Sequence, residues 1–118
     1  MGALLAACAA VSLLLAARPA EAAVISPLNA AAHVGETVTV EGTASEVFTD
    51  KRSGTTFIDL GGRYPGNAFS GVIFSSYAGS FPDVHHLEGK TVGITGKIQL
   101  YKGKPEIILR SRSQLSMP

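Results

Sequence analysis

The stretch TVGITGKIQLY at residues 91–101 predicts a long β-strand that bends near its middle. Four apolar side chains alternate with polar or small ones, with the period of a strand that buries one face: Val92, Ile94, Ile98 and Leu100. Gly96 interrupts this run, and a glycine inside a strand is typical of a bulge or a sharp bend. A small barrel needs such strands, because one bent strand serves both sides of the closure.

A second long strand with an internal glycine precedes it. Residues 36–50 alternate in the same way, and Gly42 interrupts them. The other expected strands are 55–60, 69–77 and 105–110, and the expected short helices are 28–33 and 82–87. The order along the chain is three strands, a helix and two strands, which predicts an all-β fold, a five-stranded antiparallel OB barrel with one short helix between strands three and four. The alternative is an open antiparallel sheet with one helix packed on it, and the polar tail 111–118 is expected to fray.

Composition limits the classes of function. The chain has 118 residues, enough for one domain, and 10 Lys and Arg against 9 Asp and Glu. The net charge therefore does not indicate a polyanion partner, and any basic surface has to be local. The one cysteine, Cys8, lies in the N-terminal segment, so the domain that follows has neither a cysteine nucleophile nor cysteine-ligated zinc.

The first 22 residues have the pattern of a secretory signal peptide. An apolar run of about 15 residues, too short to span a bilayer, is followed by Ala20-Glu21-Ala22, a small-x-small cleavage pattern. We therefore expect an exported protein, periplasmic or secreted, with one domain at 23–118 and no stable membrane insertion after the signal is removed. Because the start lacks Lys and Arg, other readings stay open: a different start site, an uncleaved anchor, or lipidation of Cys8 in the lipobox-like 5–8.

Residues 33–115 resemble the OB-fold nucleic-acid-binding domains of the anticodon-binding and helicase-associated type. The matching segments are VGETVTVEG (34–42), GTTFIDL (54–60), LEGKTVGITGKI (87–98) and YKGKPEI (101–107). Small secreted bacterial proteins share this pattern. The resemblance implies the barrel and implies nucleic-acid binding as the commonest activity, although OB barrels also hold oligosaccharides and other proteins.

Basic and aromatic residues form the candidate site. OB domains bind across strands two and three, between the loops that join strands one and two and strands four and five. Cations in these loops would follow a phosphate backbone, and aromatic rings would stack on bases. The candidates are Lys51, Arg52, Phe57, Tyr64, Lys97, Tyr101, Lys102, Lys104 and Arg110. The alternatives are that cations simply populate exposed turns and that Phe57 is buried under a loop or in a dimer contact.

The sequence offers no constellation for catalysis. His85 and His86 are adjacent, so on a helix their side chains diverge by about 100° and do not readily share a metal ion. Asp83 and Glu88 are too isolated to act as paired carboxylates, and neither Ser53 nor Ser75 has a matching His and Asp. We therefore expect no enzyme, no cofactor and no metal. The expected function is a module for single-stranded DNA or RNA, and the alternative is a periplasmic adaptor for an envelope protein or a glycan.

Overall fold

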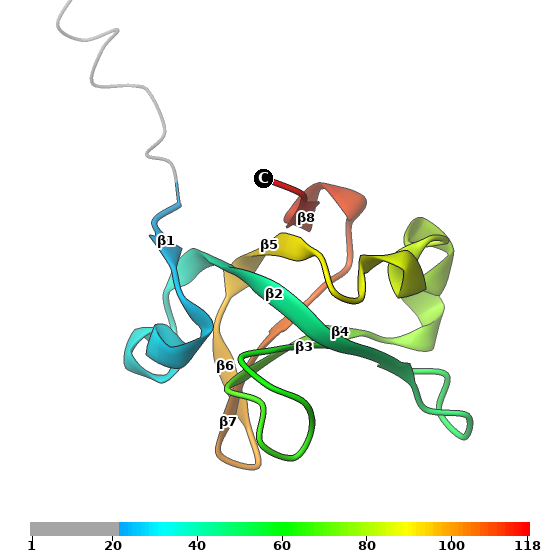
Figure 1. The fold of residues 1–118 in the computed structure, drawn as a ribbon, viewed down its shortest axis with the longest axis horizontal. Helices are drawn as coiled ribbons and strands as arrows, with labels where there is room; N and C mark the ends of the chain where they lie inside the picture. Colours follow the sequence, from blue (N-terminus) through cyan, green and yellow to red (C-terminus); the bar gives the residue numbers. More distant parts are fainter. Residues whose placement is uncertain (1–21) are drawn as a thin grey trace, which may run out of the picture.

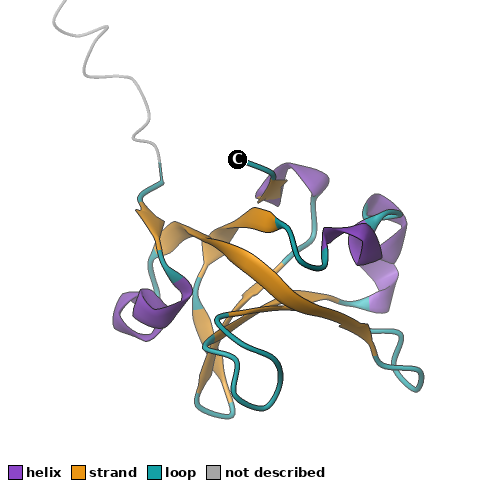
Figure 2. Cartoon of the chain, in the orientation of Figure 1, coloured by secondary structure: helices purple, strands orange, loops and turns teal. Residues whose placement is uncertain are grey.

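The computed structural model describes residues 22–118, so the expected signal peptide, apart from Ala22, lies outside the described residues. The described part is mainly β, with all eight strands in one sheet and four short 3-10 helices (Figures 1 and 2). The strands are β1 (Val24–Ile25), β2 (Thr37–Thr49), β3 (Thr56–Leu60), β4 (Phe69–Ile73), β5 (Thr91–Lys97), β6 (Gln99–Tyr101), β7 (Lys104–Ile108) and β8 (Leu115–Ser116). The helices are η1 (Pro27–His33), η2 (Ser75–Ser80), η3 (Val84–Leu87) and η4 (Arg112–Gln114). The all-β prediction is confirmed.

Strand β2 organises the sheet because its two halves have different partners. Its first half pairs with β5, from Thr37↔Lys97 to Thr43↔Thr91, and its second half pairs with β3. The strand order is β6-β7-β4-β3-β2-β5-β8, with β1 parallel to the start of β2. The β4–β7 pair is parallel, which corrects the wholly antiparallel prediction. The chain reverses direction twice between these strands, so β7 returns in the direction of β4.

The two strand glycines make room for neighbours, and the irregularities lie elsewhere. The register of β2 shifts between Ala44 and Glu46, not at Gly42, and the 91–101 strand is interrupted at Ile98, not at Gly96. A Cβ on Gly42 would lie 2.8 Å from the Pro27 side chain, and one on Gly96 would lie 2.6 Å from that of Ile107. These positions lack a side chain because η1 and β7 pack directly against them.

The core lies between the curved sheet and the short helices. Ile58, Leu60, Phe69, Ile94 and Ile107 are almost wholly buried. The η1 and η3 helices add Ala30, Val84 and Leu87 to the same cluster. None of the helices within 22–118 is long and apolar enough to cross a bilayer.

The prediction of one strand over 69–77 was wrong at its end. Strand β4 stops at Ile73, which pairs with Thr56, the first residue of β3. Past this point β4 has no partner strand, so the chain turns into η2, from which Tyr77 packs on the core. The predicted helix over 82–87 is the shorter η3.

The prediction of a fraying tail was also wrong. Ser111 and Gln114 form a capping box at η4, and β8 then pairs with β5 through Ile94↔Leu115. Leu115 is 6% exposed. Gln114 Nε2 donates to the carbonyls of Thr95 and Ile108, at 3.0 and 3.1 Å. Gln114 and Leu115 thus anchor the polar segment 111–118 to the sheet.

Candidate functional site

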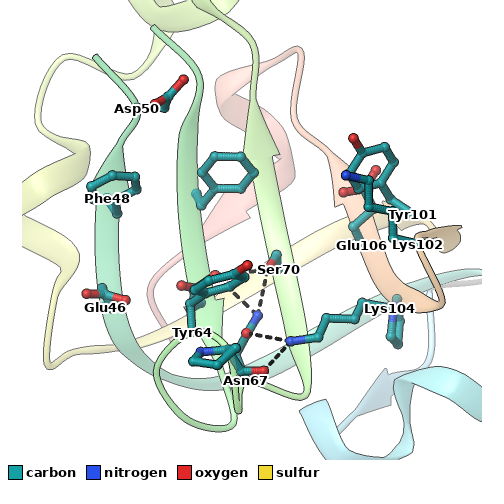
Figure 3. A pocket seen from close by; sticks show the side chains of 14 residues that line it. Glu46, Phe48, Asp50, Tyr64, Asn67, Ser70, Tyr101, Lys102, Lys104 and Glu106 are labelled. Carbon is teal, nitrogen blue, oxygen red and sulfur yellow. Dashed lines mark hydrogen bonds between the residues drawn. The ribbon is translucent and has the colours of Figure 1, made fainter. Parts of the chain in front are cut away.

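An open groove of about 720 Å³ crosses β2, β3 and β4 and continues to the β6–β7 hairpin (Figure 3). Four aromatic side chains from four segments line it: Phe48, Phe57, Tyr64 and Tyr101. Phe48 and Phe57 are direct cross-strand partners on β2 and β3. Their neighbours Val47 and Ile58 point into the core, so strand alternation turns both phenylalanines outward. Phe48, Tyr64 and Tyr101 are 52%, 73% and 59% exposed.

The structure brings five of the nine candidate residues together and leaves four apart. Phe57, Tyr64, Tyr101, Lys102 and Lys104 line the groove. The other four are exposed but do not line it: Lys51, Arg52, Lys97 and Arg110. Lys51 and Arg52 occupy the tip of the β2–β3 turn, while Asp50 at its base lines the groove. Lys97 pairs with Thr37 at the end of β5, and Arg110 follows β7.

Carboxylates outnumber lysines in the groove, which the sequence analysis missed. The four acidic side chains are Glu46, Asp50, Asp59 and Glu106. Strand alternation could have identified Glu46 and Phe48 together, since both lie on the outward face of β2. Glu46 forms a 2.9 Å ion pair with Arg63. Asp50 accepts hydrogen bonds from the Ser53 hydroxyl and amide, which lower the pKa of its carboxyl group.

Asp59 is the centre of a buried polar network under the groove. Its Oδ1 accepts hydrogen bonds from Ser70 Oγ at 2.9 Å and from Asn67 Nδ2 at 3.3 Å. Asp59 is 3% exposed and Asn67 is 6% exposed. Burial raises the pKa of Asp59, and the hydrogen bond from Ser70 opposes that shift. The network fixes the end of the 61–68 loop to β3 and β4.

Lys104 holds the 61–68 loop in place from the opposite side. Its ammonium group donates to the Pro65 carbonyl and, at 3.2 Å, to Asn67 Oδ1. The same group lies 5.3 Å from the centroid of the Tyr64 ring, within cation–π range. Lys102 makes the corresponding contact with Tyr101, at 5.4 Å. Lys104 therefore positions the loop that carries Tyr64 and has little capacity left for a ligand, whereas Lys102 stays on the rim.

Lys104→Met is expected to loosen the 61–68 loop. The substitution keeps most of the aliphatic stem but removes two hydrogen bonds and the cation–π contact, a loss of about 1–3 kcal/mol in local stability. Amide exchange within 61–68 should then accelerate by roughly fivefold or more, because about 1.4 kcal/mol corresponds to a factor of ten. Lys102→Met is the matched control and should leave these amides unchanged. Equal exchange rates in both variants would show that Lys104 does not restrain the loop.

Comparisons with known proteins support the fold alone. No protein-family model matches the chain, and no curated protein matches it. Among solved structures it is similar to a chain assigned as an aspartyl-tRNA synthetase from Leishmania major Friedlin, with a TM-score of 0.53 at 9% identity. The match covers 80% of this chain and 21% of that one, about a fifth of its length. At this identity the likeness concerns the fold. Residues 22–118 contain no cluster of three or more His, Cys, Asp or Glu side chains suited to a metal ion.

Proposed function

We propose that this chain is an exported, non-catalytic OB-type barrel that binds single-stranded nucleic acid in its aromatic groove. The apolar N-terminal run and the Ala20-Glu21-Ala22 pattern support export, and a mature mass that begins at Ala23 is the expected result. The exposed aromatic side chains that line the groove support a binding role. The likeness to a region of a tRNA synthetase supports the OB type.

Barrel closure is supported by the way the two ends of the sheet approach each other. One residue, Ile98, separates β5 from β6, and its backbone bonds to Gly35 and Glu36 just before β2. Strands β5 and β6 therefore act as one bent strand that reaches from β2 to β7. Gln114 ties β5 to the end of β7 through Thr95 and Ile108. The resulting ring has five strands: β2, β3, β4, β7 and the combined β5–β6.

The observation that carries the proposal is the convergence of four aromatic rings on the face that OB domains use. In the proposed ring β3 and β4 are the second and third strands, and the turns at 50–55 and 102–103 are the flanking loops. Phe48, Phe57, Tyr64 and Tyr101 all line the groove between these loops. Each stacked base contributes about 1–3 kcal/mol to binding, largely independent of sequence.

Fluorescence anisotropy with a labelled 12-nucleotide single strand tests the proposal. Lys102 lies on the rim and makes no hydrogen bond to the 61–68 loop, so we expect the groove to neutralise few phosphates. The logarithm of the association constant should therefore fall with the logarithm of the salt concentration with a slope of about −1 to −2. Binding should be clear at about 50 mM salt and weaker at about 200 mM. No binding at the lower concentration would reject nucleic acid as the ligand.

A second candidate is an envelope protein or a glycan, and the excess of carboxylates in the groove favours it. Acidic side chains repel phosphate but accept hydrogen bonds from cationic peptides and from sugar hydroxyls. Pull-down from an envelope extract together with glycan binding assays distinguishes this candidate. A specific partner recovered by a domain that ignores oligonucleotides would establish it in place of the first.

A further inference from the structure

Two rows of side chains cross the groove floor side by side. On β2, Glu46 and Phe48 are two residues apart and share the outward face, and on β3 Phe57 and Asp59 do the same. The register pairs Phe48 with Phe57 and Glu46 with Asp59. An aromatic pair therefore lies next to an acidic pair, about 7 Å along the strands. Figure 3 shows Phe48 above Glu46 on the same strand.

Each floor carboxylate has one oxygen fixed by a neighbour. Asp59 Oδ1 is held by Ser70 and Asn67, and Glu46 Oε2 by Arg63. Glu106, which also lines the groove, accepts from Gln99 Nε2 through Oε1 at 3.0 Å. These contacts orient the three groups before any ligand arrives.

The second oxygen of each carboxylate makes no hydrogen bond within the described part of the chain. No donor within residues 22–118 reaches Asp59 Oδ2, Glu46 Oε1 or Glu106 Oε2. In the same part of the chain no buried side-chain oxygen or nitrogen lacks a hydrogen-bond partner. These three oxygens therefore keep some contact with solvent, most at Glu46, whose side chain is 22% exposed, and least at Asp59, which is 3% exposed.

Resting on the proposed function, we infer that the acidic row selects bases that offer an amino group, above all cytosine over thymine. A base stacked on Phe48 and Phe57 extends its edge toward Glu46 and Asp59. An ionised carboxylate only accepts hydrogen bonds, and Asp or Glu accepts from N4 of cytosine. Thymine presents the carbonyl oxygen O4 at that position and is repelled. The same charges turn the phosphates outward, toward the rim at Lys102.

Anisotropy with labelled d(C)12 and d(T)12 at pH 7.5 and one fixed low salt concentration tests the inference. The two strands have the same backbone charge and the same ring size, so stacking and phosphate contacts largely cancel in their ratio. The wild-type domain should bind d(C)12 about tenfold more tightly or better. Asp59→Asn and Glu46→Gln should each bring the ratio close to one. Glu41→Gln, on β2 but outside the groove, is the matched control and should keep it.

The outcomes separate the inference from the function on which it rests. If Asp59→Asn does not fold, the ratio of d(C)12 to d(T)12 affinity measured with Glu46→Gln tests the inference, since Glu46 is nearer the solvent and its substitution should perturb folding less. Equal binding of both strands by the wild-type domain overturns base selection and leaves nucleic-acid binding intact. Binding of neither strand at low salt overturns the proposed function and this inference with it. Preferential binding of an oligo-arginine peptide assigns the acidic row to a protein ligand and rejects both.

Discussion

Replacing Phe57 and Tyr101 together by alanine is expected to weaken binding of a single-stranded oligonucleotide by about thirtyfold or more. The two rings come from β3 and from the end of β6, so in the proposed complex they would stack on different bases along the strand. At about 1–3 kcal/mol for each base, the pair contributes about 2–6 kcal/mol, and 1.4 kcal/mol is a factor of ten. Stability should change less than affinity, because Tyr101 is 59% exposed and Phe57 is only half-buried.

Anisotropy at two salt concentrations separates stacking from charge. The double variant should lose affinity with an unchanged salt slope, because it retains every phosphate contact. Phe74→Ala is the matched control, since Phe74 is 41% exposed and lies outside the groove. Circular dichroism should give native-like spectra for all the variants. An affinity within twofold of wild type would remove the aromatic face from the binding site and with it the main support for nucleic acid.

The strands could be predicted from the sequence because alternation is local information. Val38, Val40, Ile58 and Ile94 occupy core positions that a period of two identifies directly. Gly42 and Gly96 are harder to interpret, since a missing side chain looks the same in a sequence whether the chain turns or a neighbour packs closely. Only the fold brings Pro27 and Ile107 against these glycines.

The site was harder to predict because it depends on register and on distant contacts. Phe48 becomes part of the groove once the turn at 50–55 places it opposite Phe57. Lys104 has the appearance of a solvent-exposed turn lysine, yet its partners Tyr64 and Pro65 lie about 40 residues earlier in the chain. The buried Asp59 alternates with Ile58 as an outward residue should, and the 61–68 loop covers it through Asn67.

Gln114→Ala is expected to destabilise the domain more than its position in a polar tail suggests. Its Oε1 accepts from the amides of Arg110 and Ser111 at 2.8 and 3.0 Å, and its Nε2 donates to Thr95 and Ile108. Four hydrogen bonds at a net of about 0.5–1.5 kcal/mol each imply a loss of about 2–6 kcal/mol in the free energy of unfolding. For a domain of fewer than 100 residues this lowers Tm by roughly 10–50 °C.

Thermal and urea unfolding of the Gln114→Ala and Gln99→Ala variants measure the change in Tm and in the free energy of unfolding. Gln99 is the matched control because its side chain makes one hydrogen bond, to Glu106, and its loss should cost about 1 kcal/mol. If Gln114 joins β5 to β7 as the proposed barrel closure requires, amides of both strands should exchange faster in Gln114→Ala. Equal destabilisation by the two substitutions would mean that β5 and β7 hold together without Gln114. The tail would then cover the sheet without closing it, and the proposed barrel closure would rest on the combined β5–β6 strand.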